Sequence, residues 1–292
     1  MTAAITIHFR DAALTARCLD SLLADGWAPV LVWDNSADEG RSLRDLRARY
    51  RDGGPVRFVQ APGNLGFGKG MNAAMVDLAG SGQVGPVLLI NNDAVAVPGL
   101  REAALTEAAR MQPPALVAPR ILQDGQEQGW RYYQPWFGLV TRRPLPGSFR
   151  FLSGCALLVL RADYATPLFD EDFFMYGEDV ELSWRMRRQG GSLALLDRAW
   201  VVHAGAASSG QASQRYERFM VRAHRLLSRK LAGSAWAGRV MSATKLPFLL
   251  LRALLRSARY GSLAPLRALA DFSSRSSIRP TDQVARRQPR DR

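Results

Sequence analysis

The sequence of 292 residues predicts an α/β domain with a mostly parallel sheet flanked by helices, followed by a basic helical extension. Short apolar runs alternate with segments of helical spacing from residue 3 to residue 111, which is the pattern of consecutive βαβ units. A polar cluster follows each of the first four apolar runs, where open parallel sheets bind their ligands. The excess of positive charge lies entirely after residue 214, which sets the extension apart.

The expected elements follow from apolar periodicity. Buried strands are expected at residues 3–9, 29–33, 56–59, 86–90, 152–160, 192–196 and 199–203. Helices are expected at residues 12–23, 42–50 and 99–111, and another opens from a glycine-rich loop and runs to residue 78. The polar clusters after the first four strands are His8-Phe9-Arg10, Asp34-Asn35, the segment 64–72 and Asn91-Asn92-Asp93. Because the carboxyl ends of parallel strands meet at one edge, we expect a binding site there.

The net charge of +13 does not indicate a nucleic-acid substrate, because it belongs to the extension alone. Residues 1–214 carry 21 Lys and Arg against 22 Asp and Glu, whereas residues 215–292 carry 18 against 4. Two cysteines, Cys18 and Cys155, without metal-like spacing favour a reducing compartment. No signal peptide is expected, and no apolar run approaches the ~20 residues that span a bilayer.

Residues 169–190 (FDEDFFMYGEDVELSWRMRRQG) contain six carboxylates, and the aromatic rings of Phe173, Phe174 and Tyr176 lie between them. Gly177 can end the aromatic turn, and Glu178 and Asp179 then lie in the first turn of a helix, where the macrodipole favours carboxylates. Glu181 and Arg185 are four residues apart and can pair, which leaves Asp179 free to face a pocket. The alternative is a set of helix-start acids with a structural salt bridge.

Residues 63–70 (GNLGFGKG) have the spacing of a Walker A loop that ends in Lys69. Gly70 stands where the metal-binding Ser or Thr of an NTPase belongs, which weighs against a P-loop NTPase. The loop still suits an anion, because glycines let backbone amides approach a phosphate. Asp93 and His203 each follow a buried strand, and together they would form an O/N site for Mn²⁺ or Mg²⁺. A lone histidine is also compatible with a structural role.

Two further segments allow more than one interpretation. Residues 129–149 are rich in aromatic side chains, which form either a platform for a sugar or lipid or the core of a β-ribbon. Residues 215–260 alternate apolar residues with arginines at helical spacing, as interfacial helices on anionic lipid do. A packed helix pair with a solvated face and a nucleic-acid-binding helix are the alternatives. Residues 273–292 are expected to be disordered.

The ordered motifs DNS, NLGFGKGMN, LLINND, FLSGCALLVLR, FDEDFFMYGEDVELSWR and WVVHAG resemble a glycosyltransferase of family 2 with the GT-A fold. The resemblance is strongest to the bacterial rhamnosyltransferase-like branch and covers about residues 3–210. It implies that Asp179 is the catalytic base and that Asp93 and His203 bind a divalent metal, Mn²⁺ or Mg²⁺. Glu178, Glu181 and Arg185 would support the base. The resemblance implies donor contacts at Asp34, Asn64, Gly66, Asn72 and Asp93. The full set of expected donor-binding residues adds Phe9, Lys69 and Asn92.

These observations predict a metal-dependent inverting glycosyltransferase that uses a nucleotide-sugar, with rhamnose as the candidate sugar. The expected acceptor is a cell-surface polysaccharide or a lipid-linked glycan. The expected domains are residues 1–212, the transferase, and 213–272, a helical extension that holds the enzyme peripherally on the anionic cytoplasmic face of the membrane. Nucleic acid is not an expected partner. The alternatives are a P-loop-like NTPase and a non-catalytic module that binds nucleotide-sugars or membranes.

Overall fold

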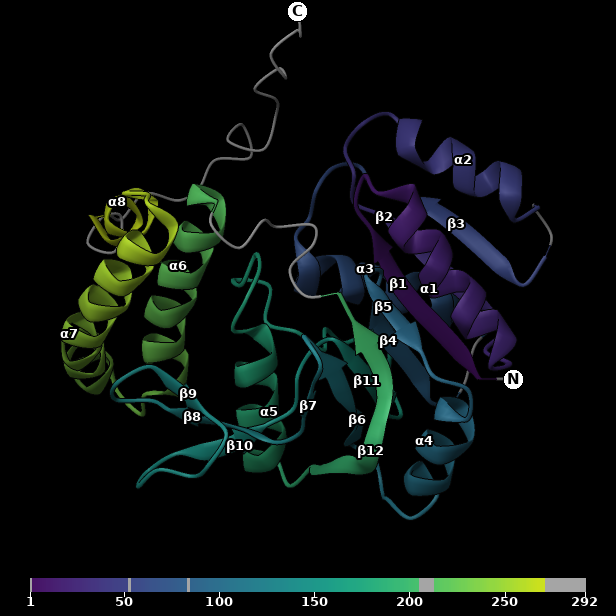
Figure 1. The fold of residues 1–292 in the computed structure, drawn as a ribbon. Helices are drawn as coiled ribbons and strands as arrows, with labels where there is room; N and C mark the ends of the chain where they lie inside the picture. The colour runs from purple at the N-terminus through teal and green to yellow at the C-terminus, as the bar shows by residue number, and fades with distance from the viewer. Residues whose placement is uncertain (1, 52–53, 83–84, 205–212, 271–292) are drawn as a thin grey trace, which may run out of the picture.

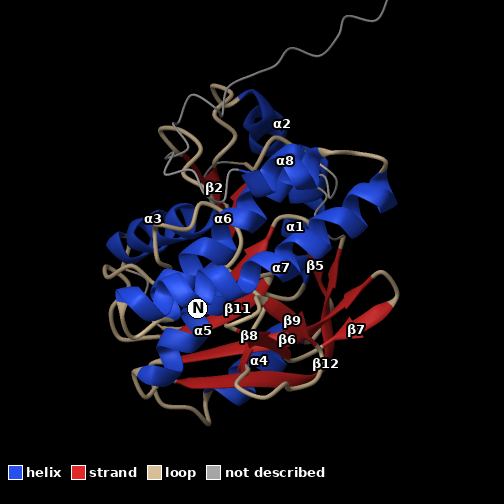
Figure 2. Ribbon diagram, turned by 90° about the vertical axis from the view of Figure 1, so that its left-hand side faces the viewer, coloured by secondary structure: helices blue, strands red, loops and turns tan. Residues whose placement is uncertain are grey.

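The structure, a computed structural model, describes residues 2–51, 54–82, 85–204 and 213–270. A twisted central sheet with helices on both faces forms the larger part, and three C-terminal helices stand together beside it (Figures 1 and 2). The segment 273–292, for which the sequence predicted disorder, lies outside the described residues.

The N-terminal half of the sheet is parallel, as predicted. Its strands lie in the order β3 (Val56–Gln60), β2 (Val30–Asp34), β1 (Ala3–His8) and β4 (Val87–Asn91). His8 is in register with Asp34, and Ile7 is in register with Asn91. The carboxyl ends of β2, β1 and β4 therefore meet at one edge, which brings three of the predicted polar clusters together.

The second half of the sheet is mixed. It continues through β11 (Ala156–Leu160), β6 (Ala115–Gln123), β12 (Ser192–His203) and β5 (Ala94–Ala96), and β7 (Gln126–Gln128) pairs with β6. Strand β11 runs antiparallel to both β4 and β6, whereas β6 and β12 are parallel.

Three of the expected strands differ from this arrangement. The predicted strand 152–160 is shorter, because only its end pairs as β11. The two strands predicted at 192–203 are one strand with register shifts between Leu195 and Val201. Strand β6, which apolar periodicity did not reveal, is the strand against which β12 pairs.

Two hydrophobic cores lie on opposite faces of the sheet, because successive strand residues point to opposite sides. One core packs against α1 (Ala12–Ala24), α2 (Arg41–Arg49) and α4 (Leu100–Ala108). The other packs against α3 (Phe67–Gly80) and α5 (Glu178–Arg188). Strand β1 shows the alternation: Ala4 belongs to the first core, and Ile5 and Ile7 belong to the second.

A third core joins a small sheet to the C-terminal helices. The sheet consists of β10 (Phe149–Phe151), β8 (Arg131–Gln134) and β9 (Leu139–Thr141), and the helices are α6 (Gln214–Leu231), α7 (Ala235–Tyr260) and α8 (Ala264–Ala270). Tyr133, Phe173 and Leu227 meet in this core. The predicted basic extension is thus helical and packs on the sheet domain, and Tyr133 is ribbon core. None of the described helices is long and apolar enough to span a membrane.

Candidate active site

Asp34 is the last residue of β2 and Asn35 follows it, and both side chains are buried. Asp34 Oδ1 accepts a hydrogen bond from the Ser36 amide at 2.9 Å, and Asn35 Nδ2 donates to the Gly66 carbonyl at 2.8 Å. Asp34 Oδ2 and Asn35 Oδ1 make no hydrogen bond with any described residue. Because buried acceptors are usually satisfied, these two oxygens are suited to donors of a bound molecule.

A buried hydrogen-bond chain connects the ends of β1 and β4. His8 Nδ1 lies 2.7 Å from Thr15 Oγ1, which accepts a hydrogen bond from Asn92 Nδ2 at 3.0 Å. His8 Nε2 lies 3.0 Å from Ser42 Oγ, and burial lowers the pKa of His8. Asn92 was predicted to contact the donor, and its amide is here part of the framework. Phe9 is half-buried, and the Arg10 guanidinium lies 5.1 Å from its ring centroid.

Asp93 and His203 are neighbours, as the sequence predicted. His203 Nε2 lies 3.1 Å from Asp93 Oδ1, and His203 Nδ1 lies 3.2 Å from Gln123 Oε1. Neutral His203 can donate its Nε2–H to Asp93. In the other tautomer the Nε2 lone pair is free to ligate a metal ion that Asp93 also binds. A small pocket of about 80 Å³ opens beside Asp93, lined also by Arg17 and Val202.

Asp179 is held by the backbone next to β11. Its Oδ2 accepts a hydrogen bond from the Gly154 amide at 3.2 Å, and its Oδ1 accepts one from the Val180 amide at 2.8 Å. The neighbouring Cys155 carbonyl accepts a hydrogen bond from the Asn91 amide at 2.9 Å. The segment that holds Asp179 is thereby bonded to Asn91, the last residue of β4, which lies two residues before Asp93. Burial raises the pKa of Asp179, so its carboxylate is a stronger base than a solvated aspartate.

The first turn of α5 holds three carboxylates in different environments. Gly177 precedes it with φ 87°, in the left-handed region that favours glycine. Burial, and then the charge of Asp179, raises the pKa of Glu178 to about 8. Glu181 is paired with Arg185, as predicted, at 2.9 Å and 3.2 Å. Near neutral pH, Glu178 is therefore largely protonated and Glu181 is paired with Arg185. Asp179 is the carboxylate of this turn that can accept a proton from a substrate.

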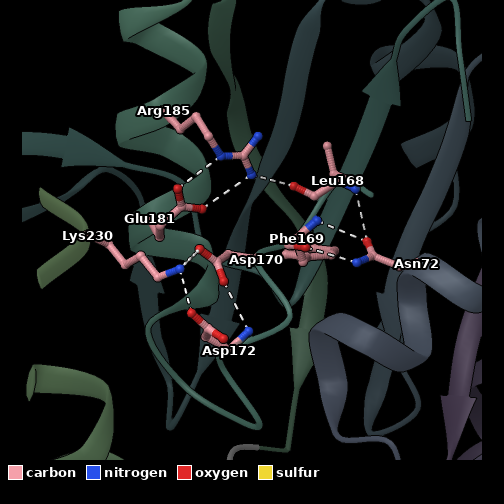
Figure 3. Close-up of polar contacts among 8 residues, drawn as sticks. All are labelled: Asn72, Leu168, Phe169, Asp170, Asp172, Glu181, Arg185 and Lys230. Atoms are coloured by element: carbon pink, nitrogen blue, oxygen red, sulfur yellow. Dashed lines mark hydrogen bonds and ion pairs between the residues drawn. The ribbon is translucent and has the colours of Figure 1, made fainter. Parts of the chain in front are cut away.

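Asn72 fastens the acidic segment to α3 (Figure 3). Its Oδ1 accepts hydrogen bonds from the amides of Leu168 at 3.0 Å and Phe169 at 2.9 Å. Its Nδ2 donates to the Phe169 carbonyl at 2.9 Å and to Glu171 Oε1 at 3.2 Å. Four hydrogen bonds are the full capacity of an amide side chain. The structure thus gives Asn72 a scaffolding position in place of the free donor ligand that the sequence predicted.

Lys230 of α6 fastens the same segment from the other side (Figure 3). Its Nζ lies 2.7 Å from Asp170 Oδ2 and 2.6 Å from Asp172 Oδ2. The ion pairs raise the pKa of Lys230, and the hydrogen bond from Lys230 is the main cause that lowers the pKa of Asp172. Nothing in the spacing of the sequence links a lysine of the extension to this motif, and Lys230 was not predicted as a site residue.

The glycine-rich loop is packed against the acidic segment. A Cβ on Gly66, which has φ 81°, would lie 2.3 Å from the Phe174 carbonyl. That carbonyl accepts a hydrogen bond from the Phe67 amide at 2.9 Å, and Asn64 Oδ1 accepts one from the Gly66 amide at 2.9 Å. The prediction that these amides cradle a phosphate is therefore wrong for Gly66 and Phe67, since both amides bond within the protein.

The Walker-like spacing of this loop has a packing explanation. A Cβ on Gly70 would lie 2.8 Å from Asn35 Nδ2 and 3.0 Å from Ile7 Cδ1, so the Ser or Thr of an NTPase has no room there. Lys69 is exposed and lies 3.8 Å from Glu171. This packing weighs against the P-loop alternative.

Sequence comparison supports the resemblance. No protein-family model matches the chain. The chain is 28% identical over 222 residues to the N-acetylglucosaminyl-diphospho-decaprenol L-rhamnosyltransferase of Mycobacterium tuberculosis, in strains CDC 1551 and H37Rv. The match covers 65% of this chain and 71% of that protein.

Solved structures share the fold at low sequence identity. GalNAc-T7 with UDP, GalNAc and Mn²⁺ matches 76% of this chain with a TM-score of 0.57 and 15% identity. The chain spans about half of GalNAc-T7, 47%. TarS 1-349 of S. aureus matches 95% of this chain and 75% of its own length, with a TM-score of 0.53 and 13% identity. The TarS complex with UDP matches 97% of this chain and 77% of its own length, with a TM-score of 0.51 and 15% identity.

Proposed function

We propose that the chain is a glycosyltransferase of the rhamnosyltransferase-like branch of family 2 with the GT-A fold. In this proposal it transfers rhamnose with inversion from a nucleotide-sugar to a lipid-linked glycan. The observation that carries the proposal is the contact of Asp93 with His203 after β4, together with the backbone link from the same strand end, through Cys155 and Gly154, to Asp179. The decaprenol-linked substrate in the name of the mycobacterial relative supports a lipid-linked acceptor. UDP bound to similar folds supports a nucleotide-sugar donor.

Asp179 is the proposed general base. Inverting transfer needs a base that takes the proton of the acceptor hydroxyl while that oxygen attacks the anomeric carbon. The raised pKa of Asp179 strengthens its basicity, and the amides of Gly154 and Val180 hold its orientation. The neighbouring Glu178, with a pKa of about 8, is largely protonated at pH 7 and adds little negative charge.

Asp93 and His203 fit a divalent cation. They offer one carboxylate and one imidazole nitrogen, which lie 3.1 Å apart, so both can ligate the same ion. No group of three or more His, Cys, Asp and Glu side chains within the described ranges could hold a metal by itself. Ions such as Mg²⁺ commonly take one or two protein ligands and complete their shell with phosphates and water. When bound, the metal would neutralise charge on the departing diphosphate.

Asp34 and Asn35 are the proposed contacts of the nucleoside. Their unsatisfied oxygens, Asp34 Oδ2 and Asn35 Oδ1, are acceptors for the N–H of a pyrimidine base or for a ribose hydroxyl. Asn64 and Gly66 shape the adjoining loop through their mutual hydrogen bond, so they are proposed to support the donor pocket indirectly. Residues 1–212 are the proposed transferase domain, and residues 213–272 are proposed to keep it at the cytoplasmic face of the membrane.

A thermal-shift panel tests the donor and metal assignments. Nucleoside diphosphates and nucleotide-sugars are each added with Mn²⁺, Mg²⁺ or EDTA, because a ligand of the native state raises the melting temperature by mass action. We expect stabilisation by one nucleotide-sugar that depends on the metal and is lost in Asp93→Ala. Asp179→Asn should keep this stabilisation but lose transfer to the acceptor. Retained transfer in Asp179→Asn would refute its role as base, and stabilisation by ATP alone would refute the donor assignment.

A further inference from the structure

The outer face of α7 is apolar over most of its length. The inner face, which packs against α6 and α8, carries the buried residues Gly238, Met241, Lys245, Leu249 and Ala253. With 3.6 residues per turn, the opposite face carries Pro247, Leu250, Leu251, Leu254 and Leu255, all of them exposed. Of the fifteen exposed large apolar side chains in the described ranges, seven lie on α7.

Buried polar contacts fix which face of α7 points outward. Lys245 Nζ donates to the His224 carbonyl at 3.1 Å and to Ser228 Oγ at 2.8 Å. Glu217 of α6, which is fully buried, pairs with Arg252 at 2.7 Å and with Arg256 at 2.6 Å. Rotating α7 to hide its leucines would leave the buried polar groups of Lys245 and Glu217 without partners, and such a rotation is strongly unfavourable.

The apolar surface continues from α7 onto the β8–β9 hairpin. The ring of Phe137, in the hairpin turn, lies 4.9 Å from the ring of Phe248. Thr244 Oγ1 donates to the Trp136 carbonyl at 2.5 Å, which joins the same turn to α7. Trp136, Phe137 and Val140 are exposed. Figure 1 shows the hairpin lying beside the α6–α7 pair, so two segments a hundred residues apart in sequence share one surface.

The charges around this surface are almost all positive. Residues 213–270 contain 12 Lys and Arg, and their single carboxylate, Glu217, is buried and paired with Arg252 and Arg256. Of the other basic side chains, Lys245 is buried and Lys230 pairs with Asp170 and Asp172. Exposed Arg239 and Arg259 lie at the two margins of the apolar face of α7, by the helical repeat. An apolar stripe with cationic margins and no exposed carboxylate complements anionic lipid headgroups over acyl chains.

We propose that the outer face of α7 and the turn of the β8–β9 hairpin form one docking surface for an anionic lipid bilayer. The surface consists of Trp136, Phe137, Phe248, Leu250, Leu251, Leu254 and Leu255. The proposal rests on the proposed function, because it takes the acceptor to be lipid-linked. The lipid of that acceptor would stay in the bilayer while its glycan reaches the active site. The docking surface thus includes the β8–β9 hairpin in addition to helix α7 of the basic extension.

The charge pattern argues against a second copy of the chain as the occupant. A two-fold interface through α7 would bring the cationic margins of two copies together, and like charges facing each other disfavour association. Anionic lipid instead attracts each nearby Lys or Arg, by about 1 kcal/mol apiece.

Vesicle flotation of the full-length protein tests the docking surface. The vesicles are phosphatidylcholine with or without phosphatidylglycerol, and the test variant is Leu251→Glu with Leu255→Glu. These side chains are 55% and 63% exposed, so the exchange should not disturb folding. The matched control is Val76→Glu, which is 46% exposed but lies on α3. A second variant, Trp136→Gln, tests the hairpin.

We expect the native protein and Val76→Glu to float with phosphatidylglycerol vesicles and less with phosphatidylcholine alone. Leu251→Glu/Leu255→Glu should lose at least about tenfold in partitioning, and Trp136→Gln should lose part of it. Transfer to a water-soluble acceptor analogue should stay unchanged in all of them. Flotation of the double variant equal to that of the native protein would overturn the proposal, as would a native dimer that the double variant dissociates. Vesicle binding without any transferase activity would refute the proposed function and leave the docking surface intact.

Discussion

Replacing Asn72 by alanine distinguishes a scaffolding residue from a donor ligand. The change leaves the buried amides of Leu168 and Phe169 without their acceptor, and it leaves the Phe169 carbonyl without a side-chain donor. Each unsatisfied buried group costs about 1–3 kcal/mol. Partial relaxation of the segment reduces the sum, so we expect a loss of about 2–4 kcal/mol in the free energy of unfolding.

Thermal unfolding followed by circular dichroism measures this loss. For a protein of this size, 1 kcal/mol corresponds to a change of about 2–4 °C, so the melting temperature of Asn72→Ala should fall by roughly 4–16 °C. Lys69→Ala is the matched control, because its 3.8 Å contact with Glu171 is exposed and worth at most about 1 kcal/mol. Donor KM, measured at a temperature where the variant is folded, should change less than kcat, since the segment leads into α5 and Asp179.

The scaffolding interpretation has a clear refutation. If Asn72→Ala melts within about 2 °C of the native protein and raises the donor KM with kcat unchanged, the side chain binds the donor directly. The hydrogen bonds to Leu168 and Phe169 would then be energetically unimportant.

Three other outcomes are expected. Because the pKa of Glu178 rises from 4.5 to about 8 on folding, the native state holds a proton that the unfolded chain releases between these values. The free energy of unfolding should therefore fall as pH rises through that interval, and Glu178→Gln should flatten the fall in urea titrations; an unchanged slope would contradict the shift. Lys230→Met should lower kcat/KM by about threefold to tenfold, because two partly exposed ion pairs contribute about 1 kcal/mol, and added salt should reduce the native rate in the same direction. Gly70→Ser, which completes the Walker A sequence, should destabilise the fold by about 1–3 kcal/mol and give no ATPase activity in a phosphate-release assay.

The local pattern of the sequence was sufficient for the framework of the site. Alternating apolar runs and helices predicted β1 to β4 and their parallel direction, whereas the strand order and the register of His8 with Asp34 come from the structure. The same strand-end rule placed Asp34 and Asp93 at one edge, and the four-residue spacing predicted the pair of Glu181 with Arg185. These features depend on strand and helix periods, which are properties of neighbouring residues.

Long-range packing decided what the sequence left open. Spacing made the glycine-rich loop look like a phosphate cradle, whereas Gly66 and Gly70 are small because Phe174 and Asn35 lie against them. Asn72 of α3 and Lys230 of α6 both bond to the acidic segment. These contacts join residues far apart in the chain, so no periodic pattern in the sequence indicates them.

The extension shows the same division. Its composition predicted basic amphipathic helices, and the sequence alone left both packing and membrane binding open. The buried partners of Lys245 and Glu217 determine which face of α7 points inward. Composition and period thus determined β1 to β4, their intervening helices and their polar ends, because each of these is a local property. The use of each polar side chain depended on which segments meet in three dimensions, and only the tertiary structure determines that.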